Sequence, residues 1–174
     1  SGGVDSLVCA ELAREAGTLA GCVFVDYGHP AQIAEGWKAF SYHGRHGVPL
    51  RVVHAFGLHL ADMAGDSGSS SRVVPARNLM LIASAANHAA GMGADEVWIG
   101  ATAGDDRDYP DCRASWIEAV DGVTRAACGV GVRAPLIAMV KAEVVREALR
   151  LGIHRSDSVS CYQPGSGGAA CGAC

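Results

Sequence analysis

The sequence lacks the features that a membrane-spanning or generally nucleic-acid-binding protein needs. Its apolar runs are far shorter than the stretch of about 20 residues that crosses a bilayer. Only 18% of its 174 residues are charged, and the net charge is −4. A general nucleic-acid-binding surface needs clustered positive charge, which this balance argues against. We therefore expect no membrane association and no direct nucleic-acid partner, and we leave a homodimer open.

The cysteines do not form the pattern of a disulfide framework. Four of the seven are scattered through predicted helices, strands and loops, whereas Cys161, Cys171 and Cys174 cluster near the end. This distribution favours a reducing, cytoplasmic setting with one metal site. Hydrophobic residues make up 49% of the chain, which is typical of a globular protein. We expect a single domain over residues 1–174, whose last part, 153–174, is a metal-binding tail.

Apolar patterning predicts strands that alternate with helices. A helix follows the opening glycines, and residues 154 onward look irregular. This order predicts an α/β fold with a doubly wound parallel sheet and ligands at the carboxyl ends of its strands. The expected strands cover 21–28, 50–57, 95–102 and 130–136, and the expected helices cover about 31–46, 79–92, 114–127 and 141–151.

The chain opens on "SGGVDS", a glycine turn that leads into a helix. Adjacent glycines allow a close approach to the backbone, and the unpaired N–H groups of a helix N-terminus favour an anion. The predicted ligand is a phosphate held by this loop. The alternative is an ordinary turn in which Asp5 or Ser6 serves as the helix N-cap.

Two cationic side chains stand at predicted helix starts. Arg77 follows Pro75 and precedes Asn78, a candidate N-cap, and its guanidinium suits a phosphate or a carboxylate. Lys141 begins the last helix, where it offers a compact counter-charge for a departing pyrophosphate. Either cation can equally be a solvated surface residue.

The polar loop over residues 103–113 is the third candidate region. Tyr109 is suited to stack on a flat heterocycle, and the Asp111 carboxylate can accept paired N–H groups from an amide edge. Arg113 adds a cation to the same loop. The alternative is a solvated surface turn. Cys112 has no evident activating partner, so we expect it to be a packed thiol and not a nucleophile.

The cysteine tail predicts a zinc site. Cys171 and Cys174 have the C-x-x-C spacing that places two thiolates on one tetrahedral ion, and Cys161 supplies a third. The fourth ligand is expected beyond Cys174, with His154 as a weaker substitute. A redox C-x-x-C is the rival interpretation, but that motif normally opens a helix in a thioredoxin-like pattern.

The chain resembles the 7-cyano-7-deazaguanine synthases, the QueC family. The resemblance rests on six motifs that occur in this order: SGGVDS, FVDYG, VPARN, YPDCR, PLIAMVKAEVV and SCY…CGAC. The resemblance covers nearly the whole chain. It implies the adenine nucleotide alpha hydrolase-like fold of the PP-loop ATP pyrophosphatases, and a first strand before Ser1. Ala76 stands where the family usually has glycine before Arg-Asn.

The resemblance also implies an activity. The family converts 7-carboxy-7-deazaguanine, ammonia and ATP into the nitrile through an adenylated carboxylate and an adenylated amide. The implied catalytic cations are Lys141 and Arg77. The implied substrate contacts are Tyr109, Asp111 and Arg113. The implied metals are Mg²⁺ and a zinc ion held by four cysteines. A paralogue that adenylates another carboxylate, for example in antiphage defence, and a PP-loop tRNA-thiolating enzyme remain alternatives. The implied ATP-binding residues are Ser1, Gly2, Gly3, Val4, Asp5 and Ser6.

Overall fold

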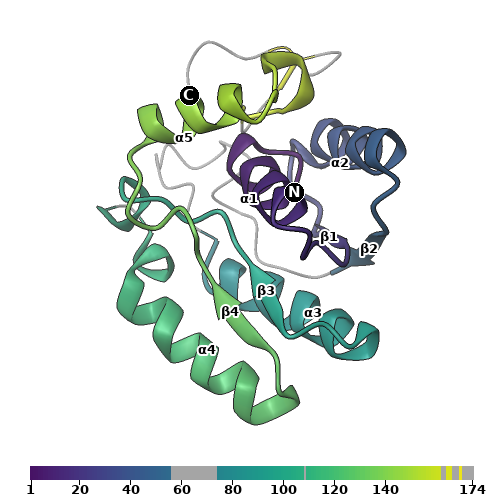
Figure 1. Ribbon diagram of the computed structural model, residues 1–174. Coiled ribbons are helices and arrows are strands. Elements are labelled where there is room, and N and C mark those ends of the chain that lie inside the picture. Colours follow the sequence, from purple (N-terminus) through teal and green to yellow (C-terminus); the bar gives the residue numbers. More distant parts are fainter. Residues whose placement is uncertain (56–73, 108, 162–163, 166–168, 170–174) are drawn as a thin grey trace. The chain divides into compact units, whose positions relative to one another are not determined.

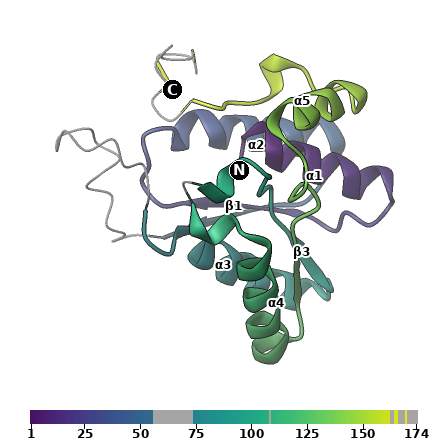
Figure 2. The same ribbon diagram turned by 90° about the vertical axis from the view of Figure 1, so that its left-hand side faces the viewer.

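The computed structural model is shown in Figures 1 and 2. It describes the chain outside residues 56–73, 108, 162–163, 166–168 and 170–174. The fold divides into two compact units. The first comprises Ser1–Val4, Gly21–Pro75 and His154–Cys174, and the second comprises Asp5–Ala20 and Ala76–Ile153.

Helix α1 begins immediately after the two opening glycines and spans Val4–Glu15. An acidic residue in its first turn and Arg14 in its last turn both complement the helix dipole. Asp5 and Ser6 lie inside the helix, so the alternative in which one of them is the N-cap is wrong.

The first unit is built on two parallel strands. β1 (Cys22–Asp26) pairs with β2 (Leu50–His54) in register from Cys22↔Leu50 to Asp26↔His54. Helix α2 (Gln32–His46) connects them and contacts both strands. It ends at Gly47, whose φ of 65° is left-handed backbone that favours glycine. The short 3₁₀ turn η4 (Arg155–Asp157) packs against α2.

The second unit also has two parallel strands, β3 (Glu96–Trp98) and β4 (Gly131–Arg133). Besides α1, which lies in this unit from Asp5 onward, three helices accompany the strands: α3 (Arg77–Met92), α4 (Ala114–Cys128) and α5 (Lys141–Arg150). Two 3₁₀ turns, η2 (Asp105–Arg107) and η3 (Pro110–Cys112), interrupt the loop after β3. The main core of this unit contains Ile82, Ala101, Cys112, Ile117, Val120, Val132 and Ala134.

The expected order of strands and helices is confirmed, and the fold is α/β with parallel strands. β3 and β4 are shorter than the apolar runs suggest. Only three residues of each run form the parallel ladder, from Glu96↔Gly131 to Trp98↔Arg133. The described strands form two parallel pairs. The single doubly wound sheet and the single domain remain predictions.

The start of α3 differs from the expected one. Ala76 is the N-cap and Asn78 lies within the first turn, so the prediction that Asn78 caps the helix is wrong. Ala76 has φ 56° and ψ 21°, which makes it the one non-glycine residue with positive φ among those described. An alanine in this left-handed region carries strain because its Cβ crowds the following carbonyl.

Glycine at position 76 is expected to stabilise the protein. Ala76→Gly removes the Cβ strain of about 1–2 kcal/mol but increases the entropy of the unfolded chain by about 0.4–1 kcal/mol. The expected net gain in the free energy of unfolding is roughly 0.5–1 kcal/mol, measurable by urea denaturation. Gly47→Ala is the matched control, because it places a Cβ at an equally left-handed position with nothing within 4 Å. Gly47→Ala should lower the free energy of unfolding. If Ala76→Gly lowered it too, strain at Ala76 would be excluded as the explanation.

Candidate functional site

Gly2, the first of the two opening glycines, is packed tightly against protein backbone within the first unit. A Cβ on Gly2 would lie 2.3 Å from the Glu35 carbonyl oxygen, so a side chain cannot be accommodated there. The Gly2 carbonyl accepts a hydrogen bond of 2.9 Å from the Val159 N–H. Gly2 is buried, and it therefore fixes how the loop packs against α2.

In the second unit, the first turn of α1 meets the first residue of α5. Lys141 Nζ donates to both Asp5 carboxylate oxygens, at 2.7 and 2.8 Å. The lysine side chain is 56% exposed and that of Asp5 is 26% exposed. The structure thus brings together two predicted site residues that are 136 positions apart.

Gly100, just after β3, is a site residue that sequence reasoning missed. A Cβ on it would lie 2.7 Å from Asp5 Cβ and 3.1 Å from Ser6 N. Only glycine lets the β3 segment approach the start of α1 this closely. The sequence did contain a signal for this contact, because Gly100 stands at the carboxyl end of a predicted strand. A glycine in such a place often marks a point where another backbone segment comes close.

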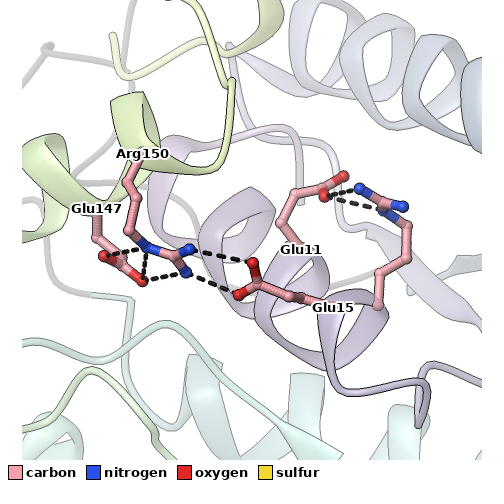
Figure 3. A network of polar contacts seen from close by, with 5 residues as sticks. Glu11, Glu15, Glu147 and Arg150 are labelled. Atoms are coloured by element: carbon pink, nitrogen blue, oxygen red, sulfur yellow. Dashed lines mark hydrogen bonds and ion pairs between the residues drawn. The ribbon is translucent and has the colours of Figure 1, made fainter.

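Helices α1 and α5 are also joined at their other ends (Figure 3). Arg150 donates to both Glu15 oxygens, at 3.0 and 2.8 Å, and to Glu147 on its own helix. These hydrogen bonds lower the pKa of the Glu15 and Glu147 carboxyls. Because Asp5 pairs with Lys141 near the helix N-termini and Glu15 pairs with Arg150 near the C-termini, the two helices run parallel.

The segment after β3 is tied to the chain that precedes Lys141. The Ala103 N–H donates to the Met139 carbonyl at 3.0 Å. Thr102 is 1% exposed, and both its N–H and its hydroxyl donate to Asp105, at 3.0 and 2.7 Å. These bonds hold the loop that carries Tyr109 and the other predicted substrate contacts.

A second group of predicted residues gathers at the start of α3. The Arg77 guanidinium lies over the Tyr109 ring, 5.8 Å from its centroid. Asp111 accepts from the Asn78 N–H at 3.4 Å, so this carboxylate faces the positive end of α3. Arg113 donates from Nε to the Asp106 carbonyl at 3.4 Å, within its own loop. The structure therefore places Arg77, Tyr109 and Asp111 next to one another.

Cys112 is a packed thiol, in line with the expectation. It is buried in the core of the second unit, and Asn78 Nδ2 donates to its sulfur at 3.5 Å. Burial, followed by the neighbouring Asp111 and Asp105 carboxylates, raises the pKa of Cys112 to about 11. Because the thiolate is the nucleophilic form, Cys112 is unreactive at neutral pH.

His29, which follows β1 in the first unit, is buried and only 4% exposed. Its ring stacks on Tyr27 with centroids 4.4 Å apart, and its Nε2 lies 3.3 Å from Glu35 Oε2. No feature of the sequence distinguished Glu35 as its neighbour, because that contact depends on how α2 packs.

Only part of the predicted zinc site lies within the described residues. Cys161 is buried, and His154 donates its N–H to Asp157 at 2.8 Å. Cys171 and Cys174 lie outside the described residues. Across the described part of the chain, no group of three metal-ligating side chains occurs, and no helix is long and apolar enough to cross a membrane.

Comparison with known proteins decides the family. The family model described as "Queuosine biosynthesis protein QueC" matches residues 1–174. The chain belongs to the QueC family. QueC-family relatives named 7-cyano-7-deazaguanine synthase include those of Anaeromyxobacter sp. (strain Fw109-5) and Novosphingobium aromaticivorans, each 37% identical. The alignments cover 100% of this chain and 84% and 82% of those relatives.

A solved structure shares the fold of this QueC-family chain. It is the U34-tRNA thiolase NcsA from Methanococcus maripaludis with its [4Fe-4S] cluster, with a TM-score of 0.60 and 17% identity. The match covers 95% of this chain and 58% of that one. At this identity the likeness concerns the fold alone.

Proposed function

We propose that this chain is an ATP-dependent 7-cyano-7-deazaguanine synthase. Membership of the QueC family and the printed names of its relatives support this assignment. The observation that carries it is the pairing of Lys141 with Asp5 at the start of α1, directly after the glycine loop. A phosphate-binding loop and a lysine are what an enzyme needs if it activates a carboxylate by adenylation.

The chemistry begins with a substrate carboxylate, which is a poor electrophile until one oxygen becomes part of a leaving group. Attack on the α-phosphate of ATP forms an acyl adenylate and releases pyrophosphate. In the proposed mechanism, the loop from Ser1 to Ser6 and the free N–H groups of α1 hold the phosphates. Lys141 neutralises the charge that develops on the departing pyrophosphate.

The later steps use the same groups. Ammonia displaces AMP to give an amide, a second activation occurs at the amide oxygen, and loss of that oxygen gives the nitrile. We assign Arg77 to neutralising the negative charge of the substrate carboxylate or the phosphate, because its guanidinium lies over the ring of Tyr109, a predicted substrate contact. Bringing two anions together is the main barrier, so positioning and charge neutralisation account for most of the catalysis.

Two metals belong to the proposal. The thiol of Cys161 and those of Cys171 and Cys174 are a donor set that suits Zn²⁺, which would order the tail. Mg²⁺ would neutralise part of the triphosphate charge. The zinc site and the zinc-binding tail stay predictions, as does the doubly wound sheet.

The direct test measures AMP and pyrophosphate release from ATP with 7-carboxy-7-deazaguanine and ammonia. The expected result is formation of the nitrile with ATP consumption that depends on this carboxylate. ATP consumption with a different carboxylate only would support the paralogue alternative instead. Adenylation of tRNA without a response to the deazaguanine would support the thiolation alternative.

Asp111→Asn is expected to weaken binding of the deazaguanine far more than binding of ATP. The carboxylate that accepts N–H groups from the purine-like edge becomes an amide that accepts less well. We expect KM for the deazaguanine to rise about 10- to 100-fold, the size of a charged hydrogen bond, while KM for ATP changes less than twofold. Asp106→Asn in the same loop is the control. Equal effects of Asp111→Asn on both substrates would place this loop in the nucleotide site.

A further inference from the structure

Two side chains of the first unit, close together in the sequence, have buried polar atoms without a hydrogen-bond partner. His29 is 4% exposed, and neither Nδ1 nor Nε2 of its ring makes a hydrogen bond with the described residues. The same holds for Oε1 of Gln32, whose backbone N–H donates to the His29 carbonyl at 3.0 Å. Buried polar atoms are nearly always paired, so unpaired ones point to a ligand, an ion or an ordered water.

Glu35 adds a negative charge to this group. Its Oε2 lies 3.3 Å from His29 Nε2, outside hydrogen-bond geometry, and its side chain is 21% exposed. Within the described part of the chain, its charged contact is with this imidazole and not with a lysine or arginine. The group therefore offers a carboxylate, an amide oxygen and one acceptor nitrogen of a neutral imidazole. Such a set suits a small cation that carries several N–H donors.

The group lies beside the proposed phosphate-binding loop. His29 comes shortly after the end of β1, and the carboxyl ends of parallel strands are where ligands bind in such sheets. Glu35 lies in the first turn of α2, and its carbonyl oxygen is the atom that a Cβ on Gly2 would approach to 2.3 Å. Gly2, His29 and Glu35 all belong to the first unit. A cation held by this group is therefore close to the backbone of the loop.

We propose that His29, Gln32 and Glu35 bind ammonium and that His29 takes a proton from it. This inference rests on the proposed synthase function, in which ammonia is the nucleophile that displaces AMP. Ammonium carries four N–H donors and one positive charge, which match the acceptors and the carboxylate. A metal ion fits less well, because no group of three metal-ligating side chains occurs among the residues that the structure describes.

The proton transfer makes the nucleophile available. Ammonium has no lone pair, so it cannot attack the acyl adenylate. Transfer of one proton to the unprotonated nitrogen of His29 leaves ammonia, and Glu35 stabilises the imidazolium. The nitrogen lone pair then forms the C–N bond, and the bond from the carbonyl carbon to the AMP oxygen breaks with its electron pair on AMP. The nitrogen loses a second proton to water, so the products are the amide, AMP and two protons.

ATP–pyrophosphate exchange separates amination from the adenylation that precedes it. The exchange needs ATP and 7-carboxy-7-deazaguanine but no ammonium. In His29→Gln we expect exchange within about twofold of the wild type, while amide formation from ammonium chloride falls about 100-fold or more, the size of a general-base contribution. Loss of both activities by the same factor would mean that His29 supports the loop, and the ammonium site would be wrong. A wild-type protein without carboxylate-dependent exchange would overturn the proposed function itself, and the ammonium site with it.

Hydroxylamine shows whether proton removal is the defect. It is uncharged at neutral pH, so it attacks the acyl adenylate without first losing a proton. His29→Gln should form the hydroxamate at a rate within about threefold of the wild type, because this nucleophile does not need the base. An equal loss with ammonium and with hydroxylamine would contradict the role of His29 as the base.

His54→Gln is the matched control. His54 ends the neighbouring strand β2, and its Nδ1 lies 3.3 Å from Asp26 Oδ2, the same separation as between His29 and Glu35. Its side chain is 55% exposed, so it has no comparable buried, unpaired nitrogen. His54→Gln should leave exchange and amide formation unchanged, and an effect equal to that of His29→Gln would overturn the assignment to His29.

Gln32→Leu gives a result that does not depend on activity. It replaces a buried, unpaired acceptor with an apolar group of similar length, so the urea midpoint should stay the same or rise. The KM for ammonium should rise about tenfold, the size of one neutral hydrogen bond. A lower urea midpoint, or an unchanged KM for ammonium, would show that Gln32 does not face the cation and would contradict the proposed site.

Discussion

Lys141→Met is expected to lower kcat for AMP release by roughly 100- to 1000-fold, the usual effect of removing one preorganised charge from a transition state. Folding should be retained, because the lysine side chain is 56% exposed and exposed ion pairs add little stability. Rapid-quench measurement of AMP release, together with thermal unfolding, checks both parts. Lys38→Met is the control, since Lys38 is the other lysine of the chain and lies on α2. Near-wild-type AMP release from Lys141→Met would remove the lysine from the mechanism.

The role of Asp5 can be separated from that of Lys141 by a double-mutant cycle. If Asp5 acts by positioning the lysine, Asp5→Asn should lower kcat in the wild-type background and have little further effect in Lys141→Met. Effects that simply add would mean that Asp5 acts on the nucleotide independently of the lysine.

Gly100→Ala is expected to lower the free energy of unfolding by about 2 kcal/mol or more, since overpacking of this kind typically costs about 1–3 kcal/mol. The added Cβ would lie 2.7 Å from Asp5 Cβ and 2.9 Å from the Asp5 carbonyl carbon, so backbone has to move. Because that backbone belongs to the helix that follows the proposed phosphate-binding loop, turnover should fall as well. Urea denaturation and AMP release measure the two effects.

Gly104→Ala provides the comparison for this substitution. Gly104 lies four residues further along the same loop, and its Cβ would meet nothing within 4 Å. Its stability should stay within about 0.5 kcal/mol of the wild type. If Gly100→Ala and Gly104→Ala were equally stable, the inference that Gly100 lies too close to α1 for a side chain would be wrong.

Local sequence patterns predicted the helices well but not the contacts between them. The start of α5 at Lys141 follows from apolar periodicity within a few residues. The bond from Lys141 to Asp5 joins residues 136 positions apart, which no local pattern encodes. The same limit applies to Gly100 and to the position of Arg77 over Tyr109, because both depend on packing across the unit.

Departures from a family pattern were more informative than propensities at the start of α3. Ala76, where the resemblance implied a glycine, is the one non-glycine residue with positive φ among those the structure describes. Asn78, a good capping residue by type, lies two residues after the N-cap position, within the first turn of the helix. Side-chain preference alone cannot locate a helix start to within two residues. For Cys171 and Cys174, which lie outside the described residues, the zinc ligation stays a prediction.

If the nucleotide binds as proposed, the parallel arrangement of α1 and α5 links its binding to the stability of the second unit. Two parallel macrodipoles repel, because their positive N-terminal ends lie together and so do their negative C-terminal ends. Asp5 offsets this in the free protein by pairing with Lys141. A bound polyphosphate would supply more negative charge to the same ends, and anything that binds only the folded state raises its stability. In the proposed site, the unfavourable electrostatic energy between the two helix N-termini would therefore be relieved when the anionic nucleotide binds.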